Sequence, residues 1–111
     1  MPKISGRFYF KLTDAGNLIG ENSNSETDNS LPESALRDSR THTRSFIGDY
    51  VSTWYEPTKG CRGAANLRIT AKGTPFDLFT LTWTELSKLT PLHHGEAMLC
   101  DGRLIGNYWS V

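Results

Sequence analysis

Five aromatic residues on strand-like segments are the side chains best suited to bind a molecule: Tyr50, Trp54, Trp83, Tyr108 and Trp109. Tryptophan and tyrosine combine a large apolar face with a polar edge, so inward-facing copies could line a pocket for an apolar or ring-shaped ligand. Large aromatic residues also fill the cores of small β-proteins. The sequence therefore leaves two interpretations open, a ligand pocket and a packed interior.

His93, His94 and Glu96 are side chains that could bind a metal ion. On a strand, His94 and Glu96 would share one face, but His93 would point to the opposite face because successive side chains alternate. The spacing, with His42 as a distant third imidazole, matches no zinc motif. We therefore expect no metal, and we expect His94 or Glu96 to be a polar contact at the rim of a pocket.

Residues for nucleophilic or acid–base catalysis are present, but not in an arrangement that enzymes use. No serine lies in a Gly-x-Ser-x-Gly motif. Cys61 has basic neighbours that would favour a reactive thiolate, yet no partner base can be identified. Asp49, Glu56 and Glu85 are scattered near tryptophans, which does not define an acid–base pair. Catalysis is therefore the least favoured function class, and no cofactor is expected.

Two copies of Gly-x-Leu-Ile-Gly, at residues 16–20 and 102–106, raise the question of a phosphate-binding loop. Such a loop needs a helix after its glycines, and no helical periodicity follows either copy. Turn-forming residues instead occur at 14–17 and at Asp101-Gly102. We therefore expect each copy to begin the return strand of a β-hairpin.

Alternation of apolar and polar residues, typical of half-buried strands, extends over much of the chain. Strands are expected at residues 4–12, 18–19, 45–55, 65–71, 75–84, 96–100 and 103–110, with a turn-rich stretch at residues 86–95. Near Leu78 and Phe79 the apolar face switches, which indicates a bulge or a strong bend. Residues 22–44 are polar, and they are expected to be a long insertion with a short helix at residues 32–37, capped by Ser30.

These elements predict a single all-β domain spanning residues 1–111, an antiparallel up-and-down barrel of about seven or eight strands. Consecutive hairpins favour the up-and-down order, and closing the sheet would remove its exposed edges. A sandwich is the alternative that the pattern leaves open.

The balance of charge limits the classes of partner. Twelve basic residues cancel twelve acidic ones, so no basic field is available for nucleic acid or an anionic membrane. No apolar run is long enough to span a bilayer, and the start of the chain lacks an apolar signal segment. The two cysteines, Cys61 and Cys100, could form one disulfide, but we favour free thiols for them. We therefore expect a cytoplasmic protein.

Residues 45–54, with the sequence SFIGDYVSTW, resemble strands of calycin-type barrels such as lipocalins and avidins. Residues 79–83 (FTLTW) and 106–109 (GNYW) are similar in style to the repeating strands of those barrels. The resemblance covers residues 45–111, and Gly48-Asp49-Tyr50 departs from the Gly-x-Trp pattern of lipocalins. It implies a barrel that binds a small ligand in its mouth.

The favoured function is non-enzymatic binding of a small, partly apolar molecule. Six residues are expected to form its site, four aromatic walls and two polar contacts at the rim: Tyr50, Trp54, Trp83, Trp109, His94 and Glu96. The alternative is an interaction module with a filled core. In that case the 22–44 segment or an exposed aromatic strand face binds another protein or a second copy of the chain.

Overall fold

The computed structural model describes residues 5–25, 30–38, 45–56, 60–73 and 78–111. They form eight β-strands: β1 (Ser5–Leu12), β2 (Leu18–Asn24), β3 (Leu31–Arg37), β4 (Gly48–Glu56), β5 (Cys61–Gly73), β6 (Leu78–Thr84), β7 (Pro91–Cys100) and β8 (Arg103–Ser110). Each strand pairs antiparallel with its neighbours in the chain, and β1 also pairs with β8, which closes the barrel. The predicted all-β, up-and-down barrel is therefore confirmed. The described residues contain no helix, and hence none long and apolar enough to cross a membrane.

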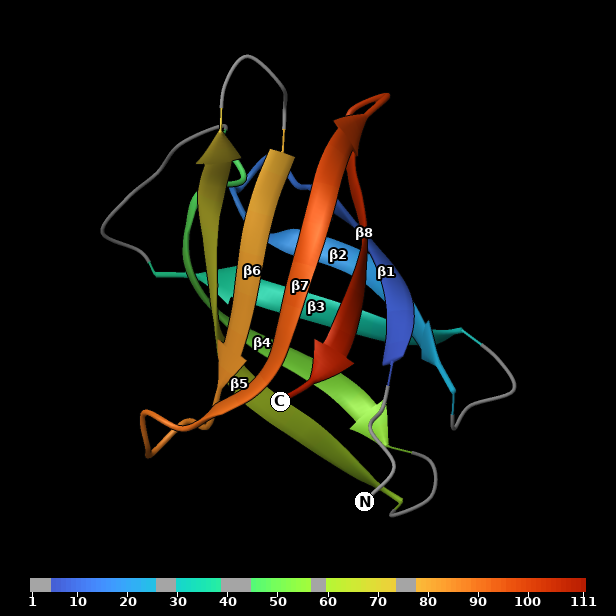
Figure 1. The fold of residues 1–111 in the computed structure, drawn as a ribbon, viewed down its shortest axis with the longest axis vertical. Coiled ribbons are helices and arrows are strands. Elements are labelled where there is room, and N and C mark those ends of the chain that lie inside the picture. The colour runs from blue at the N-terminus through green and yellow to red at the C-terminus, as the bar shows by residue number, and fades with distance from the viewer. Residues whose placement is uncertain (1–4, 26–29, 39–44, 57–59, 74–77) are drawn as a thin grey trace.

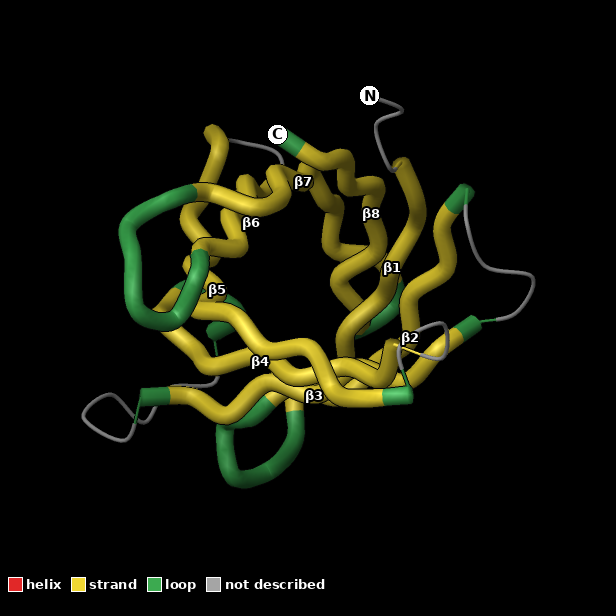
Figure 2. The backbone as a smooth tube through the Cα atoms, turned by 90° about the horizontal axis from the view of Figure 1, so that it is seen from below, coloured by secondary structure: helices red, strands yellow, loops and turns green. Residues whose placement is uncertain are grey.

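The barrel is strongly twisted, and its two ends differ. In Figure 1, β6, β7 and β8 run steeply while β2, β3 and β4 cross behind them, and Figure 2 shows the strands as one closed ring. We call the end where β3 finishes at Arg37 the arginine end. The opposite end, where β3 begins near Glu33 and where β8 finishes, is the glutamate end.

Side chains from every strand fill the barrel interior. Its largest fully buried apolar side chains are those of Phe10, Leu18, Leu67, Ile69, Leu81 and Leu104. They occupy alternate positions of their strands, as the apolar periodicity predicts. Four polar or charged residues are buried as well: Asn22, Glu33, Arg37 and Ser52.

The 22–44 segment differs from its prediction. Its first residues continue β2 to Asn24, and residues 31–37, expected to be helical, form the barrel strand β3. Glu33, Ala35 and Arg37 face inward, with exposed residues between them. Two of these three inward positions are charged, so the sequence of this strand does not show the alternation of apolar and polar residues that marks the other strands. Residues 26–29 and 39–44 lie outside the described residues.

The strand β7 also begins earlier than predicted, at Pro91 rather than residue 96. Gly95 is buried there, and a Cβ on it would lie 3.1 Å from the Trp83 ring and 3.0 Å from a backbone oxygen. The glycine thus makes room for the indole of Trp83. Because glycine is also common in turns, the sequence of this stretch favours a turn over a strand.

Two local predictions concern turns and bulges, and both are confirmed. Asp101 and Gly102 have φ values of 53° and 75°, as a two-residue hairpin turn with left-handed central residues requires. The pairing of β5 with β6 shifts register between Ala71 and Gly73, opposite Phe79 and Leu78. The register shift thus lies opposite Leu78 and Phe79, where the apolar residues of β6 change from one face of the strand to the other.

Candidate functional site

Glu33 lies inside the barrel at the glutamate end and is 6% exposed. Its carboxylate accepts hydrogen bonds from three neutral donors on three other strands. Asn22 Nδ2 lies at 2.9 Å, Ser52 Oγ at 2.5 Å and Trp83 Nε1 at 3.1 Å. Burial raises the pKa of Glu33, because desolvation disfavours the charged form, while the three donors oppose that shift.

Trp83 connects this carboxylate to a cluster of aromatic rings. Its ring packs edge-on against Phe8, with centroids 5.6 Å apart, and lies 6.0 Å from the ring of Tyr108. His93 contacts Tyr108 edge-on at 5.5 Å. The bond from Trp83 to Glu33 therefore fixes the ring that supports Tyr108.

Tyr108 stands between the interior and an outer depression. Asn24 Nδ2 donates a hydrogen bond to the Tyr108 hydroxyl at 3.0 Å. Burial is the main cause that raises the pKa of Tyr108, and the charge of Glu33 adds to the shift. A Cβ on Gly6 would lie 2.7 Å from the Tyr108 ring and 2.2 Å from the Ser23 carbonyl oxygen. Only glycine at this position of β1 lets the tyrosine pack against the backbone.

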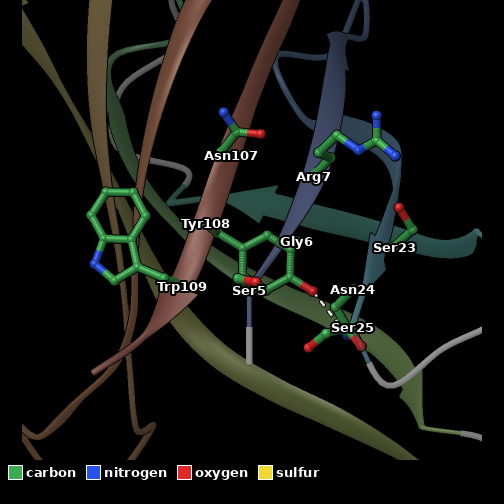
Figure 3. A pocket seen from close by; sticks show the side chains of 9 residues that line it. All are labelled: Ser5, Gly6, Arg7, Ser23, Asn24, Ser25, Asn107, Tyr108 and Trp109. Atoms are coloured by element: carbon green, nitrogen blue, oxygen red, sulfur yellow. Dashed lines mark hydrogen bonds between the residues drawn. The ribbon is translucent and has the colours of Figure 1, made fainter. Parts of the chain in front are cut away.

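The depression itself is open to solvent, has a volume of about 510 Å³, and is lined by residues 5–7, 23–25 and 107–109 (Figure 3). These residues belong to the start of β1, to the end of β2 with Ser25 directly after it, and to the second half of β8. Arg7 is the cross-strand partner of both Ser23 and Asn107. The lining thus combines aromatic rings with hydrogen-bonding side chains, which is the mixture typical of small-molecule sites.

The arginine end has a different construction. Arg37, 6% exposed, donates hydrogen bonds to the carbonyl oxygens of Gly16 at 2.7 Å, Ile47 at 3.0 Å and Ser45. It also donates to the Tyr50 hydroxyl at 2.6 Å, and its guanidinium lies 4.7 Å from the centre of the Tyr50 ring. One side chain therefore ties its own strand, β3, to the turn between β1 and β2 and to residues 45–47 at this end.

The aromatic residues predicted to wall one pocket are distributed over different parts of the barrel. Trp83 and half-buried Trp54 face the interior towards the glutamate end. Tyr50 faces the interior at the arginine end, where its hydroxyl donates to the Phe46 carbonyl oxygen at 2.6 Å and burial raises its pKa to about 12. Trp109 lies on the outer surface, 38% exposed, and lines the depression.

The two polar residues predicted at the rim share a face, but it is the outer face. His94 is half-buried and pairs across strands with Trp109. Glu96 is exposed and forms a salt bridge with Lys72 on the neighbouring sheet surface. The structure therefore does not bring the six predicted residues into one pocket.

The residues that sequence reasoning missed are Glu33, Arg37 and their polar partners. They lie in or near the polar segment that was interpreted as a loop. The period of two in Glu33-x-Ala35-x-Arg37 is the signal of a strand in this segment, but charged residues carry it, so it does not resemble the apolar alternation of the other strands.

Possible metal ligands and similarity to known proteins are two further sources of evidence about the site. No group of three or more metal-ligating side chains forms within the described parts of the chain, and Cys100 is an exposed free thiol. Comparison with protein-family models, with curated proteins and with solved structures finds no match to this chain.

Proposed function

We propose that this protein binds a small, partly apolar molecule in the depression at the glutamate end and catalyses no reaction on it. The observation that carries the proposal is the lining, in which Tyr108 and Trp109 stand beside the polar side chains of Arg7, Ser23 and Asn107. Its volume of about 510 Å³ is within the range of small-molecule sites.

The buried Glu33 carboxylate also supports a binding site at the glutamate end. Burying a charge is unfavourable unless its partners are well placed, so residues such as Glu33 are often kept for function. Here Glu33 holds Trp83, and Trp83 packs against Tyr108, which forms part of the lining. Glu33 is thus a positioning residue in this proposal, since it acts on the depression through two aromatic rings.

The test is a titration with N-phenyl-1-naphthylamine, an uncharged aromatic probe whose fluorescence rises in apolar surroundings. Trp109→Ala removes the exposed aromatic ring of the depression, and Tyr55→Ala removes a similarly exposed ring from the outer face of β4. We expect saturable binding that Trp109→Ala weakens about five- to tenfold and Tyr55→Ala leaves unchanged, because one stacked ring contributes about 1 kcal/mol. Equal behaviour of the two variants, or no binding to the wild type, would refute the proposal.

A second candidate is self-association through the outer face of β2, β3 and β4. Leu36, 65% exposed, pairs across strands with Val51, 42% exposed, and Ile19, 51% exposed, lies on the adjacent strand. The formal net charge is zero, so two copies do not repel one another. The test is sedimentation of the wild type and of Leu36→Asp. A wild-type dimer that becomes a monomer in Leu36→Asp supports self-association through this face, and a monomer in both proteins contradicts it.

A further inference from the structure

We infer that the ligand of the depression carries an acidic oxygen group, a carboxylate, sulfonate or phosphate, and that the Arg7 guanidinium binds it. This inference rests on the proposed function and specifies the ligand class. It begins from the position of Arg7 at the centre of a row of three outward side chains. Ser23 on β2 and Asn107 on β8 are its direct cross-strand partners.

The row presents hydrogen-bond donors to one small area. A guanidinium offers a planar fork of N–H groups that matches the oxygens of a carboxylate or phosphate. The Ser23 hydroxyl and the Asn107 amide each offer a further donor on either side. Neighbouring strands lie about 4.8 Å apart, so the Ser23 and Asn107 donors each lie one strand away from Arg7.

Among the described residues, the two carboxylates that neighbour this row along or across the strands are engaged elsewhere. Glu21, two residues before Ser23 on β2, accepts a hydrogen bond from the Tyr9 hydroxyl at 2.7 Å. Glu96, the cross-strand partner of Asn107, forms its salt bridge with Lys72. The lining of the depression contains no acidic residue. Across the described parts of the chain, no ion pair or hydrogen bond engages the Arg7 side chain.

An apolar surface lies at the correct separation for the rest of the ligand. Trp109 pairs with Ser5, two residues from Arg7, so the two long side chains are diagonal neighbours about 7–8 Å apart at their backbones. Figure 3 shows the indole on one flank of the depression and the guanidinium on the other. In this arrangement the ring of the ligand would contact the indole, and its acidic group would contact the guanidinium.

Two matched probes test the inference. The compound 8-anilinonaphthalene-1-sulfonate has the aromatic body of N-phenyl-1-naphthylamine with a sulfonate added. We expect the sulfonate to bind about three- to tenfold more tightly at low salt, since a charge-assisted contact at a partly exposed site adds roughly 1 kcal/mol. Arg7→Ala should abolish this difference by weakening the sulfonate more than the uncharged probe, and Arg7→Lys should keep part of the difference.

The matched control is Arg62→Ala, which removes an exposed positive charge from β5 and gives the same net charge as Arg7→Ala. Equal affinity of the two probes, or equal weakening of the sulfonate by both alanine variants, overturns the role of Arg7. In either case the proposed function still stands if Trp109→Ala weakens the uncharged probe. Insensitivity of both probes to Trp109→Ala overturns the proposed function and this inference together.

Discussion

The two ends of β3 place opposite charges inside the same barrel. Glu33 and Arg37 are four residues apart, both face inward, and both are 6% exposed. Neither charge is paired with the other, since four strand residues span about 13 Å. Each is instead surrounded by neutral groups, carbonyl and hydroxyl oxygens for Arg37, and N–H and O–H donors for Glu33.

The difference between the ends lies in the kind of partner. Arg37 contacts mainly backbone oxygens, from Gly16, Ser45 and Ile47, so it fixes the path of the chain. Within the described parts of the chain, the Glu33 carboxylate accepts its hydrogen bonds from side chains, so it orients those side chains without fixing the backbone. This difference fits our proposal, in which the arginine end stabilises the fold and the glutamate end carries the binding surface.

The largest expected effect is that of Arg37→Ala. It leaves buried carbonyl oxygens without a donor and creates a cavity, so the free energy of unfolding should fall by about 3–5 kcal/mol. Urea denaturation measures the loss. The control is Arg68→Ala, which removes an exposed arginine paired with Asp49 and should change stability little. Similar losses of unfolding free energy in the two variants would show that the hydrogen bonds of Arg37 do not stabilise the arginine end.

Glu33→Gln should change how stability depends on pH. The folded protein holds the Glu33 proton more tightly than the unfolded chain, whose pKa is about 4.5. Below that pH the group contributes its full stability, and the contribution is lost as pH rises towards the raised folded pKa, by at most about 1.4 kcal/mol per pH unit.

The measurement is the difference in free energy of unfolding between wild type and Glu33→Gln from pH 4 upward. The wild type should lose stability relative to the variant as pH rises. A constant difference, or one that changes in the opposite direction, would mean that burial does not raise the pKa of Glu33.

A smaller contrast separates the two buried tyrosines. Tyr50→Phe removes a hydroxyl that accepts from Arg37 and donates to the Phe46 carbonyl oxygen, so we expect a loss of about 2–3 kcal/mol. Tyr108→Phe removes only the contact with half-buried Asn24, with an expected loss of about 0.5–1.5 kcal/mol. Thermal unfolding of both variants tests the order, and a reversed order would contradict the contrast between the ends.

The smallest expected effect is that of Glu96→Gln. Glu96 lies on the outer face with Lys72, outside the depression, so stability should change by less than about 0.5 kcal/mol. Affinity for N-phenyl-1-naphthylamine should not change. Weakened binding of the uncharged probe would instead favour a role for Glu96 in the site.

The barrel could be predicted from the sequence where its strands alternate apolar and polar residues. Inward Phe8, Phe10 and Leu67 and the Asp101-Gly102 turn are strong local signals of this kind. The signal failed in β3, because inward positions there carry charges whose partners come from distant strands. Ser52 and Trp83 donate the hydrogen bonds that offset the burial of Glu33. They lie on other strands, so the sequence does not identify them as partners of Glu33 until the order and register of the strands are known.

The candidate site was predicted less completely than the fold. Alternation placed Trp54 with Tyr50 on one face of β4, and both do face inward. It could not show that these residues lie towards opposite ends of the barrel, because that depends on strand register. It also could not tell that the face shared by His94 and Glu96 is the outer one, since Gly95 leaves the inner face of β7 without an apolar residue at that position.

The central claim is that the glutamate end binds a small molecule while the arginine end only closes the barrel. The most direct measurement is titration of ¹⁵N-labelled protein with N-phenyl-1-naphthylamine, followed by amide chemical-shift mapping. We predict the largest shifts at residues 5–7, 23–25 and 107–109, with none around Arg37 and Gly48. Shifts concentrated around Arg37, or no shifts at saturating probe, would contradict the claim.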